Sequence, residues 1–362
     1  MSSADQSDDA PPIDLLGLTP AEARRALARV FETTGEPSYR IDQVAGWVYE
    51  RRSRSFEEMT NLPSGLRERL ARELSLSPLD ASFEARSSDG TIKHLWRLRD
   101  GQEVESVLIP TPGRVTLCLS SQVGCALGCT FCATGDFGFR RQLHTSEIVA
   151  QFRDADRVAV EAYDRGIGNV VYMGMGEPFA NQDAVFDSLT ILHEGFGLGA
   201  RRITVSTVGV VPGIRALAAR PEPFRLAVSL HAPTHEMRER LVPIERRWPI
   251  PDLFDAIDEY QARKSRRVSF EYTLIEGLND APETAQLLVE LIGSRLAFVN
   301  LIPWNPIPGR DWAPSGGAAI SRFLGVLQAA DVPSAVRTPR GRDIAAACGQ
   351  LRLEREVESS AV

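Results

Sequence analysis

The alternation of strand-like and helix-like segments after residue 115 constrains the fold of this chain most. Short aliphatic and β-branched runs predict strands at residues 115–121, 169–174, 202–208, 224–230, 267–275 and 297–303. Helix-like segments, such as residues 145–163 and 250–264, lie between them. Strands that alternate with helices form parallel sheets with right-handed crossovers. Eight such units close a full barrel, so six predict a partial, open (βα)6 barrel that resembles a TIM barrel, with residues 333–338 as a candidate further strand. The expected fold class is therefore α/β.

The rest of the chain divides into shorter regions. Residues 1–12 are acidic and polar and predict a disordered tail. Residues 13–80 contain helical periodicity, beginning after Thr19 with a capping pattern, and predict a small helical accessory domain that binds RNA. Two alternating runs around "RDGQ" predict a β-hairpin linker over residues 81–110. The barrel is expected over residues 111–345, followed by a C-terminal segment, 346–362.

Composition narrows the class of protein. No apolar run approaches the ~18 residues of a membrane span, and the N-terminus lacks a basic, apolar secretory signal. We therefore expect a cytoplasmic protein without a membrane partner. The net charge of −7 argues against a uniformly basic surface. All basic residues except Lys93 and Lys264 are arginines, and their local clusters suit either phosphate binding or solvated helix faces.

Cysteine spacing predicts the chemistry. Cys125, Cys129 and Cys132 form a C-x3-C-x2-C motif after the first barrel strand, with no fourth cysteine nearby. Structural zinc sites and ordinary iron–sulfur sites usually take four protein ligands. Three thiolates can instead hold three corners of a cubane cluster and leave one iron open to a small chelating molecule. The alternative is a structural zinc site with a distant fourth ligand.

Other chemistry-bearing residues follow later barrel strands. In parallel βα architectures the carboxyl ends of the strands carry the active site, so these residues are expected to converge on the cysteine loop. They are Gly176, Glu177, Ser206, Ser229, Leu230, His231 and Asn305.

The motif and the barrel together resemble the radical S-adenosylmethionine (SAM) enzymes. Five segments narrow the resemblance to the RlmN/Cfr family of RNA adenosine methyltransferases and cover nearly the whole chain. These segments are "TLCLSSQVGCALGCTFCATG", "VYMGMGEP", "SLHAP", "NPIPG" and "GRDIAAACGQL". The resemblance implies a [4Fe-4S] cluster on the three cysteines and two SAM molecules per turnover. It also implies cofactor contacts at Gly176, Glu177, Ser206, Ser229, Leu230 (through its backbone), His231 and Asn305.

The resemblance further implies a covalent route. Cys348 is methylated by one SAM, and a 5′-deoxyadenosyl radical from the second takes a hydrogen from that S-methyl group. The methylene radical adds to the adenine, a base removes the ring proton, and Cys118 attacks Cys348 to release methylated RNA. Glu105 matches the proton acceptor, although Cys118 stays an alternative, and Met173 would lie near Cys348. Read without the family, the two cysteines could be buried and inert, and Glu105 could occupy the exposed face of a strand.

The implied product is 2-methyladenosine, in the peptidyl-transferase region of 23S rRNA and in tRNA at the adenosine 3′ of the anticodon. The expected partners are 23S rRNA, tRNA and a reductant protein such as flavodoxin. Three alternatives stay open at this point. They are Cfr-like methylation at adenine carbon 8, a radical SAM enzyme that acts on a small molecule, and a non-enzymatic, zinc-dependent RNA-binding protein.

Overall fold

A ten-stranded sheet organises the molecule. The computed structural model describes residues 12–76 and 79–351, so the predicted tail, except for Pro12, and the end of the C-terminal segment lie outside the described residues. The sheet has the order β14-β13-β12-β11-β10-β9-β6-β5-β4-β3. Its strands are β3 (Asp80–Arg86), β4 (Ile92–Arg97), β5 (Glu103–Thr111), β6 (Arg114–Cys118), β9 (Asn169–Tyr172), β10 (Ile203–Thr207), β11 (Arg225–Ser229), β12 (Val268–Leu274), β13 (Ala297–Pro303) and β14 (Ser334–Val336).

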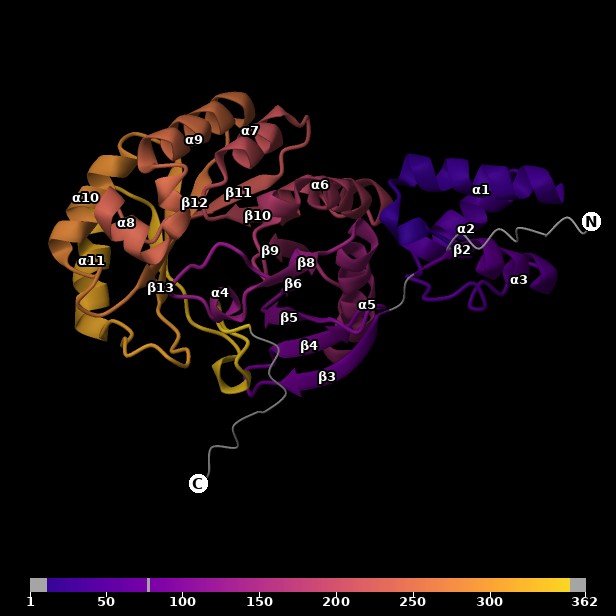
Figure 1. Ribbon diagram of the computed structural model, residues 1–362, viewed down its shortest axis with the longest axis horizontal. Coiled ribbons are helices and arrows are strands. Elements are labelled where there is room, and N and C mark those ends of the chain that lie inside the picture. The colour runs from indigo at the N-terminus through magenta and orange to yellow at the C-terminus, as the bar shows by residue number, and fades with distance from the viewer. Residues whose placement is uncertain (1–11, 77–78, 352–362) are drawn as a thin grey trace, which may run out of the picture.

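The parallel part of the sheet confirms the expected open barrel. Strands β6 and β9 to β14 pair in parallel and in chain order, which right-handed crossovers produce. Helices cover the outer face of this curved sheet (Figure 1). The crossover helices are α5 (Thr145–Tyr163), α6 (Gln182–Thr190), α7 (Val211–Ala219), α9 (Ile250–Lys264), α10 (Pro282–Ile292) and α11 (Gly317–Ala329).

Shorter elements occupy the connections. Strands β7 (Gln122–Gly124) and β8 (Phe139–Gln142) pair with each other and enclose helix α4 (Ala133–Phe137), while helix α8 (His235–Leu241) follows β11. The remaining short turns are η1 (Leu15–Gly17), η2 (Pro178–Asn181), η3 (Ile191–Gly195), η4 (Ala200–Arg202), η5 (Pro243–Arg246) and η6 (Arg342–Ile344).

The prediction of a β-hairpin linker over residues 81–110 needs correction. The hairpin exists as β4 and β5, but a third strand, β3, joins it, and all three belong to the barrel sheet. Strand β5 pairs antiparallel with β6, with Val107 opposite Cys118. Local alternation predicts that a segment is extended, but the alternation does not say which strand it pairs with. The result is that residues 80–111 line the barrel instead of connecting two domains.

The predicted helical domain is present and lies at one end of the molecule (Figure 1). It contains α1 (Pro20–Thr34), α2 (Tyr39–Tyr49) and α3 (Ser64–Glu73), and the short strands β1 (Ile13–Asp14) and β2 (Leu74–Ser75) pair across its base. The Glu22 carboxylate accepts a hydrogen bond from the Thr19 N–H at 3.0 Å, which confirms the predicted start of α1.

Buried charges fasten this domain to the barrel. The Arg153 guanidinium, on α5, donates to the Leu76 carbonyl at 2.5 Å and to the Asp154 carboxylate at 2.8 Å. The Leu79 N–H donates to the same carboxylate at 2.9 Å. Because these groups are buried and paired, separating the helical domain from α5 would leave buried charges and hydrogen-bonding groups without their partners.

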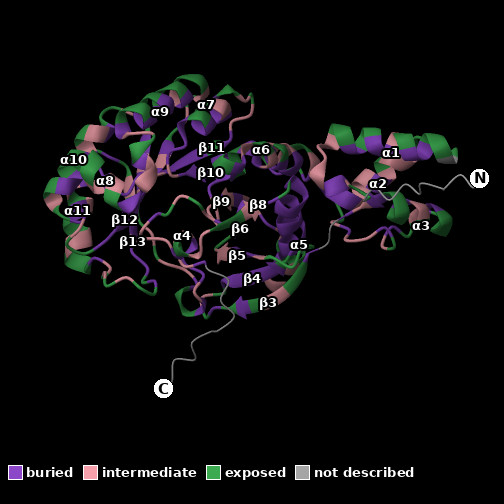
Figure 2. Cartoon of the chain, viewed as in Figure 1, coloured by how far each residue is buried: buried purple, intermediate pink, exposed green. Residues whose placement is uncertain are grey.

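Burial follows the expected layers. Strands β6 and β9 to β13 of the parallel sheet are largely buried, and the edge strand β14 is more exposed. The outer helices turn an exposed face to solvent and an apolar face to the sheet (Figure 2). Within the described residues, no helix is long and apolar enough to cross a membrane.

Candidate active site

An open cavity lies where the carboxyl ends of the barrel strands meet, as predicted. Its empty volume is about 970 Å³, including space that is open to solvent. Most of the predicted site residues line it together, namely Cys125, Cys129, Cys132, Met173, Gly176, Glu177, Ser206, Ser229, His231, Asn305 and Cys348. Leu230, Cys118 and Glu105 are not among its lining residues.

The cysteine loop is a tight excursion closed by the β7–β8 pair. The Cys125 N–H donates to the Gly138 carbonyl at 3.1 Å. Gly124 has φ +77°, and a Cβ at this position would lie 1.7 Å from the Gly138 oxygen, so only glycine fits. On the far side of the loop, the Thr130 N–H donates to the Leu241 carbonyl at 3.0 Å. The loop is therefore held from two directions.

The three thiols suit a cluster better than a single ion. Within residues 12–76 and 79–351, no group of three or more His, Cys, Asp or Glu side chains could hold one metal ion. Cys125, Cys129 and Cys132 nevertheless all line the cavity, and cysteine thiolates are the usual ligands of an iron–sulfur cluster. Burial raises the pKa of Cys125 to about 11 and that of Cys129 well above its usual value. Loading the cluster would therefore release protons from these thiols.

The "GMGEP" segment packs against the base of the cysteine loop. Gly176 has φ +96°, and a Cβ there would lie 2.5 Å from the Gln122 Cβ, so this glycine permits a close approach of β7. The Glu177 carboxylate accepts hydrogen bonds from the Phe179 N–H at 3.1 Å and the Val208 N–H at 2.9 Å. Burial raises the pKa of Glu177 to about 7. A cationic ligand such as the SAM amino or sulfonium group would favour its ionised form.

His231 is a neutral hydrogen-bonding residue at the end of β11. Its Nδ1 accepts from the Thr273 N–H at 3.0 Å, and its backbone has φ +59°, which is rare for a non-glycine residue. Burial lowers the pKa of His231 to about 3, and the nearby Arg238 charge adds to the effect. Its Nε2 has no hydrogen-bond partner among the described residues. A buried, unpaired N–H bordering the cavity fits an acceptor on a bound cofactor.

Leu230 occupies a different environment from its neighbours. It is fully buried, its N–H donates to the Glu271 carbonyl at 3.1 Å, and its carbonyl accepts from the Arg238 Nε at 3.2 Å. Both backbone groups are thus engaged inside the protein, so its predicted cofactor contact stays a prediction.

The C-terminal segment folds back onto the cysteine loop and brings Cys348 into the cavity. The Ala133 N–H donates to the Gly349 carbonyl at 2.7 Å, and the Thr134 hydroxyl donates to the Leu351 carbonyl at 2.7 Å. The Asn305 amide donates to the Cys348 carbonyl at 3.0 Å. Cys348 itself is exposed to solvent, which excludes the reading of this residue as a buried, inert cysteine.

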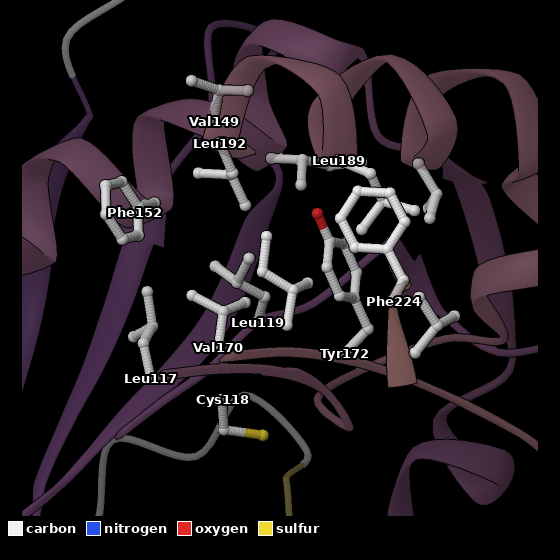
Figure 3. Packing of buried hydrophobic residues seen from close by; sticks show 14 of the residues in the cluster. Leu117, Cys118, Leu119, Val149, Phe152, Val170, Tyr172, Leu189, Leu192 and Phe224 are labelled. Atoms are coloured by element: carbon white, nitrogen blue, oxygen red, sulfur yellow. The ribbon is translucent and has the colours of Figure 1, made fainter. Parts of the chain in front are cut away.

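Cys118 and Cys348 meet at a second cavity of about 660 Å³. Cys118 points away from its chain neighbours Leu117 and Leu119, as the alternation predicts (Figure 3). Cys348 lines both cavities, and so do Cys132 and Met173. The two cavities therefore share a wall. Burial raises the pKa of Cys118 to about 12, with a smaller contribution from the Cys348 sulfur.

Glu105 is fully buried on β5, so the alternative of an exposed strand residue is wrong. Its backbone carbonyl accepts from the Ser120 hydroxyl at 2.5 Å, which places Glu105 level with the carboxyl end of β6. Its carboxylate lies 3.1 Å from the Lys93 ammonium.

Two cationic side chains near the site were not predicted from the sequence. One is Lys93, and the other is Arg337, which lines both cavities beside Cys348. Electrostatic interaction with Cys348, followed by Glu271 and Cys118, raises the pKa of Arg337. Rare lysine usage was the available signal for Lys93, since only two lysines occur in the chain.

Comparisons with known proteins agree with this geometry. Residues 119–288 match the Radical SAM superfamily, and residues 13–76 match the ribosomal RNA large subunit methyltransferase N-terminal domain. A probable dual-specificity RNA methyltransferase RlmN from Gemmatimonas aurantiaca is 47% identical over 94% of each chain. The dual-specificity RNA methyltransferase RlmN from Anaeromyxobacter dehalogenans is 46% identical over 91% of this chain and 90% of the relative.

A solved structure extends the match to three dimensions. The crystal structure of a radical SAM methyltransferase from Sphaerobacter thermophilus superposes with a TM-score of 0.90 at 48% identity. The match covers 95% of this chain and all of that one. Sequence, domain composition and fold thus agree over nearly the whole length, and the chain belongs to the RlmN family of radical SAM RNA methyltransferases, which implies a [4Fe-4S] cluster and SAM.

Proposed function

We propose that this enzyme makes 2-methyladenosine in 23S rRNA and in tRNA through a covalent intermediate on Cys348. The observation that carries the proposal is the wall shared by the two cavities. Cys348 borders the cavity of the cysteine loop on one side and the cavity of Cys118 on the other. A residue that first receives a methyl group and later forms a disulfide needs access to both. The name of the relatives, dual-specificity RNA methyltransferase, supports two RNA substrates.

Cys125, Cys129 and Cys132 would hold the cluster, and Gly176, Glu177, Ser206, Ser229 and His231 would line the SAM site. When bound, the cluster and two SAM molecules per turnover supply a methyl group and a hydrogen-abstracting radical.

The chain's own residues carry the remaining steps. The Cys348 sulfur accepts the methyl group and keeps it next to the cavity, with its backbone held by Asn305. After the methylene carbon has bonded to adenine carbon 2, the Glu105 carboxylate accepts the ring proton. The Cys118 thiolate then attacks the Cys348 sulfur and forms a disulfide, while the bond from that sulfur to the methylene carbon breaks. The bonding electron pair passes to the methylene carbon, which takes up a proton to become the methyl group of the released RNA. Met173, which borders both cavities, would pack against the reacting sulfur.

Target bases must leave their stacks to reach such a buried centre, so loops and single-stranded regions are the suitable substrates. We propose the peptidyl-transferase region of 23S rRNA and the adenosine 3′ of the tRNA anticodon. A flavodoxin-like electron donor and a cytoplasmic location stay predictions. Membership of an enzyme family argues against the non-enzymatic, zinc-dependent alternative.

Nucleoside mass spectrometry tests the proposal. The anaerobically reconstituted enzyme would be incubated with SAM, a reductant and unmodified 23S rRNA or tRNA, and the digested RNA compared with both methyladenosine isomers. We expect 2-methyladenosine from both RNAs, none from Cys348→Ala, and a trapped protein–RNA adduct from Cys118→Ala. Detection of 8-methyladenosine would instead assign the Cfr-like reaction. If neither isomer forms although SAM is cleaved, the proposed substrate is wrong.

A further inference from the structure

A buried ion pair joins two adjacent strands of the antiparallel extension, which consists of β3, β4 and β5. The Lys93 ammonium, on β4, lies 3.1 Å from a carboxylate oxygen of Glu105, on β5. The side chains are 4% and 0% exposed. Lysine is almost never fully buried unless it is paired, so its presence here calls for a specific reason. Salt bridges at this depth contribute little net stability compared with apolar side chains of similar size.

This pair faces the barrel interior. Val107 lies opposite Lys93 on one side and opposite Cys118 on the other, so all three share a face of the sheet. Val107 and Cys118 both line the second cavity. Glu105 is two residues before Val107 on the same strand and therefore has the same orientation. The pair thus lies on the same sheet face as two residues of the cavity in which the RNA adduct would be resolved, although neither Lys93 nor Glu105 lines that cavity itself.

A buried carboxyl group tends to stay protonated, because low polarity disfavours its charge. A protonated Glu105 could not accept the adenine proton. A neighbouring ammonium reverses this preference by stabilising the carboxylate, and its hydrogen bond also orients the oxygen atoms.

We propose that Lys93 is a positioning residue that keeps Glu105 ionised and oriented as the proton acceptor. This inference rests on the proposed function. In the step concerned, the C–H bond at adenine carbon 2 breaks, its electron pair stays in the base, and the proton forms an O–H bond on Glu105. Lys93 keeps its own proton throughout. Its contribution is therefore confined to the step after the covalent adduct has formed.

The same strand offers a matched control on its other face. His94 follows Lys93, stacks on Trp96 with ring centroids 4.7 Å apart, and lies 3.3 Å from Glu84 on β3. Glu84→Gln alters an ion pair of the same antiparallel sheet without touching the interior face. Lys93→Arg keeps the charge, whereas Lys93→Met keeps most of the length and removes the charge.

The test separates early steps from late ones in a single-turnover reaction with 23S rRNA. For each variant we would measure methylation of Cys348 by peptide mass, the covalent protein–RNA adduct on a denaturing gel, and 2-methyladenosine. We expect Lys93→Met to methylate Cys348 normally, to accumulate adduct, and to form product at least about tenfold more slowly, since a general base typically contributes 10²–10⁴-fold. Lys93→Arg and Glu84→Gln should stay within about threefold of wild type in product formation.

Two results would overturn the inference. Wild-type product formation by Lys93→Met would show that the charge is not needed. Parallel loss of Cys348 methylation, adduct and product in a folded Lys93→Met protein would indicate a purely structural role. If Lys93→Met does not fold, Lys93→Gln is measured instead, with the same criteria. Failure of the proposed function looks different, because the wild-type enzyme would then form no 2-methyladenosine at all, and normal turnover by Glu105→Gln would remove the proton-acceptor role itself.

Discussion

Arg238 offers the sharpest test of how the strand ends are held. This residue, on α8, is fully buried, and its guanidinium bonds three groups. Its Nε donates to the Leu230 carbonyl at 3.2 Å, and its terminal nitrogens contact the Val208 carbonyl and the Glu245 carboxylate. Val208 follows β10 and Leu230 follows β11. One buried side chain therefore connects the loops that follow β10 and β11, on which residues of the cofactor cavity lie.

We expect Arg238→Met to lower the free energy of unfolding by about 3 kcal/mol. Removing one member of a buried ion pair typically costs about 3–5 kcal/mol, because the remaining charge is left without its partner. The lower end applies here, since the Glu245 carboxylate keeps a hydrogen bond from the Ile250 N–H at 2.9 Å and a contact with His235 at 2.9 Å. Affinity for SAM should fall as well, because the two loops lose their common anchor.

Urea unfolding of the cluster-free protein measures the stability, and equilibrium binding to the reconstituted protein measures the affinity. Arg246→Met is the matched control, because Arg246 is 74% exposed and pairs with Glu239 on the surface. That variant should stay within about 0.5 kcal/mol of wild type. A loss below about 1 kcal/mol for Arg238→Met, at unchanged denaturant dependence, would refute this account of the loops.

Three further predictions concern other parts of the molecule. Gly124→Ala places a Cβ 1.7 Å from a backbone oxygen at φ +77°, so iron content after reconstitution should fall sharply while the far-UV circular dichroism stays unchanged. Arg337→Gln should slow methylation of Cys348, measured by peptide mass, because the Arg337 side chain lines both cavities together with Cys348. The hydrogen bond from His94 lowers the pKa of Glu84 from 4.5 to about 2, so this carboxylate stabilises the fold above pH 4.5 and loses its effect as the pH falls toward 2. The Glu84→Gln variant should therefore have a lower free energy of unfolding than wild type at neutral pH. Its free energy of unfolding should also decline less over that pH interval, as measured by unfolding at a series of acid pH values.

Local patterns predicted the elements of the barrel well. The helices at residues 145–163 and 250–264 begin and end where the periodicity does, and every predicted barrel strand is present. These features depend on neighbouring side chains, which a sequence displays directly. The motif loops also converge as expected, because parallel strands bring their carboxyl ends to one edge.

Contacts between distant segments were beyond the sequence alone. Nothing near Ser87 indicates that its hydroxyl donates to the Asp343 carboxylate at 2.6 Å, across 256 positions. The anchoring of the C-terminal segment through Thr134 is equally non-local. Only the family resemblance associated Cys348 with Cys118, because no spacing rule relates two lone cysteines in different elements.

The antiparallel extension explains why the sequence alone did not establish whether Glu105 is buried or exposed. A parallel sheet that ended at β6 would leave an unpaired edge, which proteins normally cover. Strand β5 covers it, and because β5 runs antiparallel, its first residues lie at the carboxyl end of β6, where the site is. As part of a linker, Glu105 would have faced solvent and needed no partner. As part of the sheet, it is fully buried and forms an ion pair with the Lys93 ammonium. The same pairing that closes the edge thus places the paired Glu105 on the sheet face that also carries the cavity residues Val107 and Cys118.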